Sequence, residues 1–151
     1  MTALKSPEPD IAVVFRAPCG NIGAALFSGA IRHVFRREGR RAASISCAVV
    51  GDAEIRELNR RFLRHDYPTD IITFPLEEDP IEAELVISAE TARRQAREYG
   101  VTMRDEYARL AIHGSLHLCG YDDRTDDDRA AMKAREDHYL SQYMQKYRTD
   151  R

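Results

Sequence analysis

A chain of 151 residues has about the length of one ordinary domain and is too short for two, so we expect one domain over residues 1–151, with 1–9 as a flexible tail. Hydrophobic residues make up 43% and charged residues 32%, which excludes an intrinsically disordered chain. The net charge of -2 excludes a strong overall attraction to nucleic acid or to an acidic membrane, so any such partner must meet a local basic patch.

The first third of the chain alternates between strand-like and helix-like patterns. Five consecutive apolar residues from Ile11 to Phe15 predict a strand. Apolar residues recur at helical spacing from Asn21 to about Glu38, and Gly39 can end that helix. Ala42 to Val50 again has β-type residues, and Asp52 can cap the helix that follows.

The middle of the chain predicts two neighbouring strands and a charged helix. A polar loop from Arg64 to Asp70 precedes the β-rich residues Ile71 to Leu76. After an acidic stretch, Glu84 to Ile87 has the same character, and we expect the two strands to pair. Ser88 can cap a helix that ends at Gly100.

Two further helices are predicted in the last third. One runs from about Asp105 to Leu118, and Gly120 can adopt the left-handed conformation that ends it. Thr125, three residues before Asp128, is typical of the cap of a last helix. The element order predicts an α+β fold, a mixed sheet of about four strands packed with about five helices.

The residues with the clearest chemistry lie at the end of the helix that precedes Gly120. His113 and His117 are four residues apart, so both imidazoles lie on one helix face and can converge on one metal ion. A turn at Gly120 can bring the carboxylate of Asp122 or Asp123 to a third ligand position. A fourth position then stays open for water, as a catalytic metal requires.

Two other interpretations of these residues exist. The histidines can be ordinary helix residues, with the acidic run at residues 122–128 favouring the N-terminus of the next helix. Metalloproteases of the H-E-x-x-H type place a general-base glutamate directly after the first histidine. Gly114 occupies that position, so the sequence does not support proteolysis.

Two motifs resemble those of the YbeY family of bacterial endoribonucleases. His113 to Asp122 is similar to the family signature H-G-x-L-H-L-x-G-Y-D. Leu58-Asn59, followed by Asp66 and then by residues 68–75, resembles L-N followed by P-T-D-V-L-S-F-P. The resemblance extends from Ile11 to about Tyr147 and implies a metal-dependent, single-strand-specific endoribonuclease that acts in ribosomal RNA maturation and ribosome quality control.

The resemblance also implies a set of metal ligands. The family has a third histidine at the position of Asp123, so the expected ligands are His113, His117 and Asp123. We expect one Zn²⁺ per chain, although two histidines and a carboxylate also suit iron. The carboxylate adds negative charge, so a bound water is expected to be less acidic than with three histidines. Asp122 matches the aspartate of the family motif, and its expected role is to orient a ligand.

The family also has an arginine where this chain has Leu63. We expect Arg64 to be the phosphate contact in its place, with Arg60 and Arg61 as alternatives; no general base is identified. Two other basic clusters are either exposed helix faces or RNA contacts. They are Arg36, Arg37, Arg40 and Arg41, and Arg93, Arg94 and Arg97.

The remaining histidines and cysteines suggest no second site. We expect His33, His65 and His138 at the surface. Cys119 should pack in the core, and Cys19 and Cys47 should be free thiols, because three cysteines without C-x-x-C spacing favour neither disulfides nor a thiolate metal site.

The expected partners are RNA, in particular ribosomal RNA, and ribosomal or ribosome-associated proteins, with no DNA and no membrane. The start of the chain lacks the apolar stretch of a signal peptide, so we expect a cytoplasmic protein. Two alternative functions stay open. The protein is either a metal-dependent hydrolase of another substrate or a non-catalytic ribosome-assembly partner with a structural metal.

Overall fold

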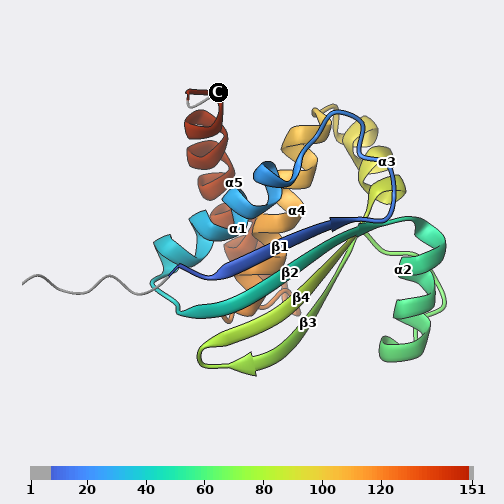
Figure 1. The fold of residues 1–151 in the computed structure, drawn as a ribbon, viewed down its shortest axis with the longest axis horizontal. Coiled ribbons are helices and arrows are strands. Elements are labelled where there is room, and N and C mark those ends of the chain that lie inside the picture. Colours follow the sequence, from blue (N-terminus) through green and yellow to red (C-terminus); the bar gives the residue numbers. More distant parts are fainter. Residues whose placement is uncertain (1–7, 150–151) are drawn as a thin grey trace, which may run out of the picture.

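The computed structural model describes residues 8–149, whose centre is a four-stranded sheet (Figure 1). Its strands are β1 (Asp10–Phe15), β2 (Ala42–Val50), β3 (Ile71–Glu78) and β4 (Ile81–Ser88), in the order β1-β2-β4-β3. β1, β2 and β4 are parallel, whereas β3 runs antiparallel to β4 at one edge. Most of the expected tail at residues 1–9 lies outside the described residues.

Five α-helices surround this sheet within the described residues. They are α1 (Ala24–Glu38), α2 (Asp52–Leu58), α3 (Ala89–Tyr99), α4 (Met103–Leu118) and α5 (Asp126–Thr149), and a short π-helical segment, η1 (Asn59–Leu63), follows α2. α1 and α4 pack on one face of the sheet, and α5 packs against both of them (Figure 1). α2 covers part of the other face, over a smaller apolar cluster. The predicted α+β fold with a mixed sheet is therefore confirmed.

Most predicted helix ends are confirmed by their capping geometry. Gly39 and Gly100 adopt left-handed conformations after α1 and α3, and Ser88 accepts a hydrogen bond from the backbone amide of Thr91. The predicted cap at Asp52 is wrong, because Gly51 precedes the first turn of α2. The Asp52 carboxylate instead accepts hydrogen bonds from the hydroxyls of Ser88 and Thr91, which ties α2 to the start of α3.

The acidic stretch between the two predicted strands lies inside a hairpin. β3 continues to Glu78 and β4 begins at Ile81, so the strands pair over more residues than the local pattern indicates. The pairing with β4 supplies backbone hydrogen bonds to residues of low strand propensity. β3 has no partner on its outer side among the described residues, so it forms a free edge beside the smaller apolar cluster.

His33 is buried, so its predicted surface position is wrong. It is 8% exposed on α1, and its Nε2 atom lies 3.1 Å from Oε1 of Gln142 on α5. Its ring packs edge-on against Tyr139, and burial lowers its pKa. His65 and His138 are exposed as predicted, and Cys119 is buried. No helix in the described part of the chain is both long and apolar enough to cross a membrane.

Gly114 allows α4 to lie close to the sheet. A Cβ atom at this position would stand 2.8 Å from Cδ1 of Ile71 and 2.9 Å from Cδ2 of Leu85, which is closer than packed carbon atoms approach. Gly114 lies one residue after His113, so the same close approach sets the height of the histidines above β3.

We predict that Gly114→Val lowers the free energy of unfolding by about 1–3 kcal/mol, the usual range for an overpacked core. Helix propensity alone would slightly favour the substitution, so the loss must come from the contact with Ile71 and Leu85. Ala130→Val on the exposed side of α5 is the matched control, and it should change stability by about 0.5 kcal/mol. Equal losses in the two variants, measured by denaturant unfolding, would contradict this packing.

Candidate metal centre

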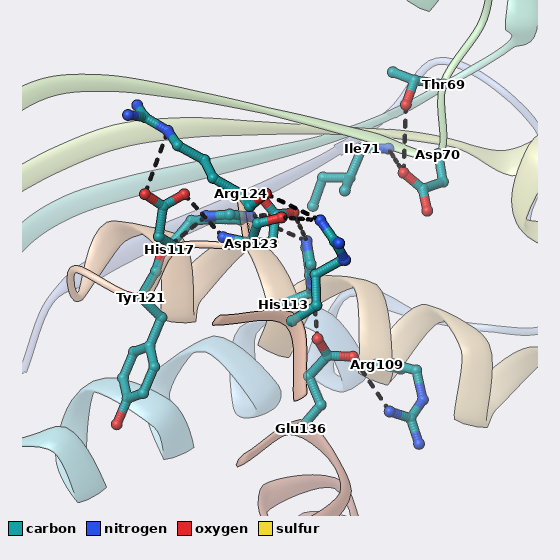
Figure 2. Close-up of polar contacts among 12 residues, drawn as sticks. Thr69, Asp70, Ile71, Arg109, His113, His117, Tyr121, Asp123, Arg124 and Glu136 are labelled. Carbon is teal, nitrogen blue, oxygen red and sulfur yellow. Dashed lines mark hydrogen bonds and ion pairs between the residues drawn. The ribbon is translucent and has the colours of Figure 1, made fainter. Parts of the chain in front are cut away.

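His113 and His117 occupy the last two turns of α4, and their rings converge. The two Nε2 atoms are 3.1 Å apart, and the ring planes are nearly perpendicular at 81°. Both side chains are about three-quarters buried. The helical spacing predicts rings on one face, and the structure adds that the same nitrogen of each ring points to a common position (Figure 2).

A hydrogen bond to the other nitrogen of each ring explains this orientation. Nδ1 of His117 lies 3.0 Å from the carbonyl oxygen of Tyr121, which can only accept, so Nδ1 must donate. Nδ1 of His113 lies 2.7 Å from Oε2 of Glu136. In neutral rings these contacts place the proton on Nδ1 and leave the Nε2 lone pair bare. Two facing lone pairs repel each other unless a proton or a cation lies between them.

Asp123 adds a carboxylate to this pair. The chain turns after α4 at Gly120, which has a φ of +104°, and returns toward the histidines. Oδ2 of Asp123 lies 3.4 Å from Nε2 of His117 and 3.9 Å from Nε2 of His113. The ligand atoms of the three residues lie within 4.8 Å of one another.

Two of these three separations match one tetrahedral ion. Two ligand atoms of tetrahedral zinc stand about 3.3 Å apart, close to the 3.1 Å between the two Nε2 atoms and the 3.4 Å from His117 Nε2 to Asp123 Oδ2, whereas the 3.9 Å from His113 Nε2 to Asp123 Oδ2 is longer. Of the two carboxylates that the sequence leaves open, Asp123 is the one beside the histidines. Asp122 accepts a hydrogen bond from the backbone amide of Asp123 and pairs with Arg124, so its contact orients the backbone at Asp123.

Glu136 on α5 is a site residue that the sequence reasoning missed. It is buried, and its second oxygen accepts a hydrogen bond of 3.2 Å from Arg109 on α4 (Figure 2). The sequence feature that could have identified Glu136 is its position on the core face of α5, four residues after Met132 and three before Tyr139. A carboxylate on a core face needs a partner, and His113 and Arg109 provide two.

The charges around His113 alter its basicity. Burial by itself lowers the pKa of His113, but the hydrogen bond to Glu136 and the carboxylates of Asp70 and Asp123 outweigh burial and raise it. Because a metal binds only the neutral ring, protons compete with a metal at this position.

Two clefts meet at His113. The larger, of about 1270 Å³, lies between α3, α4 and α5, and the smaller, of about 780 Å³, lies between β3 and the end of α4. Asp70, His113 and Asp123 line both clefts. Asp70 is held by the backbone amide of Ile71 at 2.7 Å and by the side chain of Gln95 at 3.2 Å.

The predicted arginines differ in whether they line these clefts. Arg64 is exposed, has a φ of +60° and lines neither cleft in the described structure, whereas Leu63 lines the smaller one. Arg60 is paired with Glu57. Arg40 belongs to one of the other predicted clusters, and among the described residues it is the one arginine or lysine that lines the smaller cleft.

Sequence and structure comparisons agree with the motif resemblance. A family model described as endoribonuclease YbeY matches residues 23–144. The endoribonuclease YbeY of Chlorobaculum tepidum is 44% identical over 128 residues, which cover 84% of this chain and 93% of that protein. The endoribonuclease YbeY of Rhodopirellula baltica is 39% identical, over 85% of this chain and 68% of that protein.

A solved structure has the same fold. The solution structure of TM1509 from Thermotoga maritima matches with a TM-score of 0.67 and 28% identity, over 93% of both chains. The family match covers β2 to β4, α1 to α4, most of α5 and all three residues of the candidate metal centre. The chain therefore belongs to the YbeY family.

Proposed function

We propose that this protein is a metal-dependent, single-strand-specific endoribonuclease that acts in ribosomal RNA maturation and ribosome quality control. The observation that carries the proposal is the convergence of His113 Nε2, His117 Nε2 and Asp123 Oδ2 where two clefts meet, in a chain of the YbeY family. The names of its relatives support cleavage of RNA. Ribosomal RNA as the substrate implies the cytoplasm as the location and ribosomal proteins as partners.

The three residues would hold one Zn²⁺ per chain, and iron also fits two imidazoles and one carboxylate. The bound metal would supply Lewis-acid activation of the phosphoryl group or of the attacking water. The side chain of Asp123 is 45% exposed, so the ion would face the clefts on one side. A catalytic metal needs such access, whereas a structural zinc is enclosed by four protein ligands.

Residues around the ligands would keep them in place. Glu136 and the carbonyl of Tyr121 fix the rings of His113 and His117, as outer hydrogen-bond partners of metal-bound histidines do. Arg109 in turn holds Glu136. This arrangement orients the rings before any metal arrives, so little side-chain freedom would be lost on binding.

The paired clefts favour internal cleavage over removal of terminal nucleotides. A strand that crosses the metal centre can continue on one side between β3 and α4 and on the other between α4 and α5. We propose Arg40, inside the smaller cleft, as a phosphate contact near the metal. Arg64 lies farther out and would contact a phosphate of the flanking strand.

The proposed activity is tested by cleavage of single-stranded and duplex RNA before and after chelation. We predict cleavage of the single strand, loss of activity when a chelator removes the metal, and recovery when zinc is restored. The double variant His113→Ala/His117→Ala should be inactive and metal-free by elemental analysis. His138→Ala, an exposed histidine of α5, is the control and should keep metal and activity. Cleavage at the parent rate by protein shown to be metal-free would contradict metal dependence.

The position of Asp123 gives a sharper test of the ligand set. Asp123→Ala should weaken zinc binding by about 100-fold or more, since even outer partners of ligands contribute 10–100-fold. Asp123→His should keep the site occupied by replacing the carboxylate with a third imidazole. Asp122→Ala is the matched control and should bind zinc nearly as the parent does.

Titration against a chromophoric chelator measures these affinities. If Asp123 only favours the N-terminus of α5, Asp123→Ala would lower stability by at most about 1 kcal/mol and leave zinc affinity unchanged. A loss confined to Asp122→Ala would assign the ligand role to Asp122 instead.

A further inference from the structure

Two exposed aromatic side chains and one leucine lie where α2 runs into the loop before β3. Phe62 is 59% exposed, Leu63 47% and Tyr67 52%, although large apolar side chains are usually buried. We call these three residues the aromatic platform. Phe62 contacts Phe74 of β3 edge-on, with ring centroids 5.6 Å apart, so the platform lies beside the free edge of the sheet.

The backbone around the platform is held by one buried asparagine. Asn59 is 2% exposed; its carbonyl oxygen accepts hydrogen bonds from the amides of Arg64 and His65, and its Nδ2 donates to the carbonyl of Tyr67 at 2.9 Å. Arg64 is the one non-glycine residue with positive φ in the described chain. The exposed rings therefore sit on a fixed turn, and strained turns of this kind concentrate at functional sites.

The segment that carries the platform has a local excess of positive charge. Residues 56–66 contain four arginines and two acids, against a net charge of -2 for the whole protein. Arg56 pairs with Asp66 and Arg60 pairs with Glu57. Within residues 8–149, Arg61 and Arg64 form no ion pair with a carboxylate. The guanidinium of Arg61 lies 5.5 Å from the centre of the Phe62 ring.

Leu63 connects this surface to the candidate metal centre, because it lines the smaller cleft together with His113 and His117. We propose that the aromatic platform binds the unpaired bases of single-stranded RNA, which stack on Phe62 and Tyr67 while Arg61 and Arg64 contact the flanking phosphates. Aromatic side chains next to unpaired cations suit single strands, since every base has a stacking face and every linkage a charge. The inference rests on the proposed function and adds the path of the RNA strand beyond the smaller cleft.

The test is binding of the full-length, metal-loaded protein to two oligoribonucleotides with a cleavage-resistant phosphorothioate backbone, one with bases and one abasic. Fluorescence anisotropy measures both affinities over a range of salt concentrations. Phe62→Ala and Tyr67→Ala should each weaken binding of the strand with bases about 5- to 100-fold and leave its salt dependence unchanged. Phe62→Leu separates the ring from the apolar contact with Phe74 and should lose as much as Phe62→Ala.

The abasic strand and a second set of variants distinguish stacking from charge. Parent and platform variants should bind the abasic strand equally weakly. Arg61→Gln and Arg64→Gln should weaken binding of both strands and flatten the salt dependence. Phe15→Ala is the matched control, because Phe15 is 40% exposed on β1, at the edge of the sheet opposite β3, and contacts one ring, Phe27, edge-on as Phe62 contacts Phe74.

Two results would overturn the inference while leaving the proposed function intact. One is parent-like affinity of the platform variants for the strand with bases, in a protein that cleaves RNA. The other is an equal loss for the abasic strand, which would mean that the rings only support the loop or bind another protein. A parent that neither binds nor cleaves RNA would overturn the proposed function itself.

Discussion

The arrangement of the site depends on two imidazole nitrogens that face each other across 3.1 Å. Their lone pairs repel in the absence of a cation, so hydrogen bonds to the opposite nitrogen, Nδ1, must fix both rings. The Tyr121 carbonyl holds His117 and the Glu136 carboxylate holds His113. A cation between the rings would convert this repulsion into binding, and the carboxylate of Asp123 stands on the same side to share its charge.

Several elements of the fold serve this arrangement. Gly114 lets α4 lie close to β3 and β4, and the turn at Gly120 returns the chain so that Tyr121 and Asp123 reach His117. α5 packs across α4 and brings Glu136 to His113. Outer partners of this kind fix the tautomer and orientation of metal ligands. The chain therefore uses contacts between distant segments to prepare a ligand set that begins as a local helical pair.

The difference between local patterns and contacts between distant segments explains what the sequence could predict. The pairing of the hairpin strands, the helix caps at Ser88 and Gly100, and the return of a carboxylate from Asp122 or Asp123 to the histidines follow from local spacing and turn residues, whereas the choice of Asp123 came from the family resemblance. Glu136 was missed because its partners lie on another helix, and His33 was misplaced for the same reason, since α5 covers it. Local periodicity identifies a buried face but does not say which helix covers that face.

The charge around the site bears directly on RNA binding. The smaller cleft is lined by four carboxylates and one arginine, Arg40, so without a cation it repels phosphate. A bound metal and the unpaired arginines beside the cleft would offset this repulsion.

The central claim is that His113 and His117 converge on one metal ion, and X-ray absorption at the zinc edge of the loaded protein tests it most directly. We predict multiple scattering from two imidazoles and an oxygen ligand at about 2.0–2.2 Å. A spectrum without imidazole scattering, or one that is unchanged in His113→Ala/His117→Ala, would contradict the convergence of these histidines on a metal.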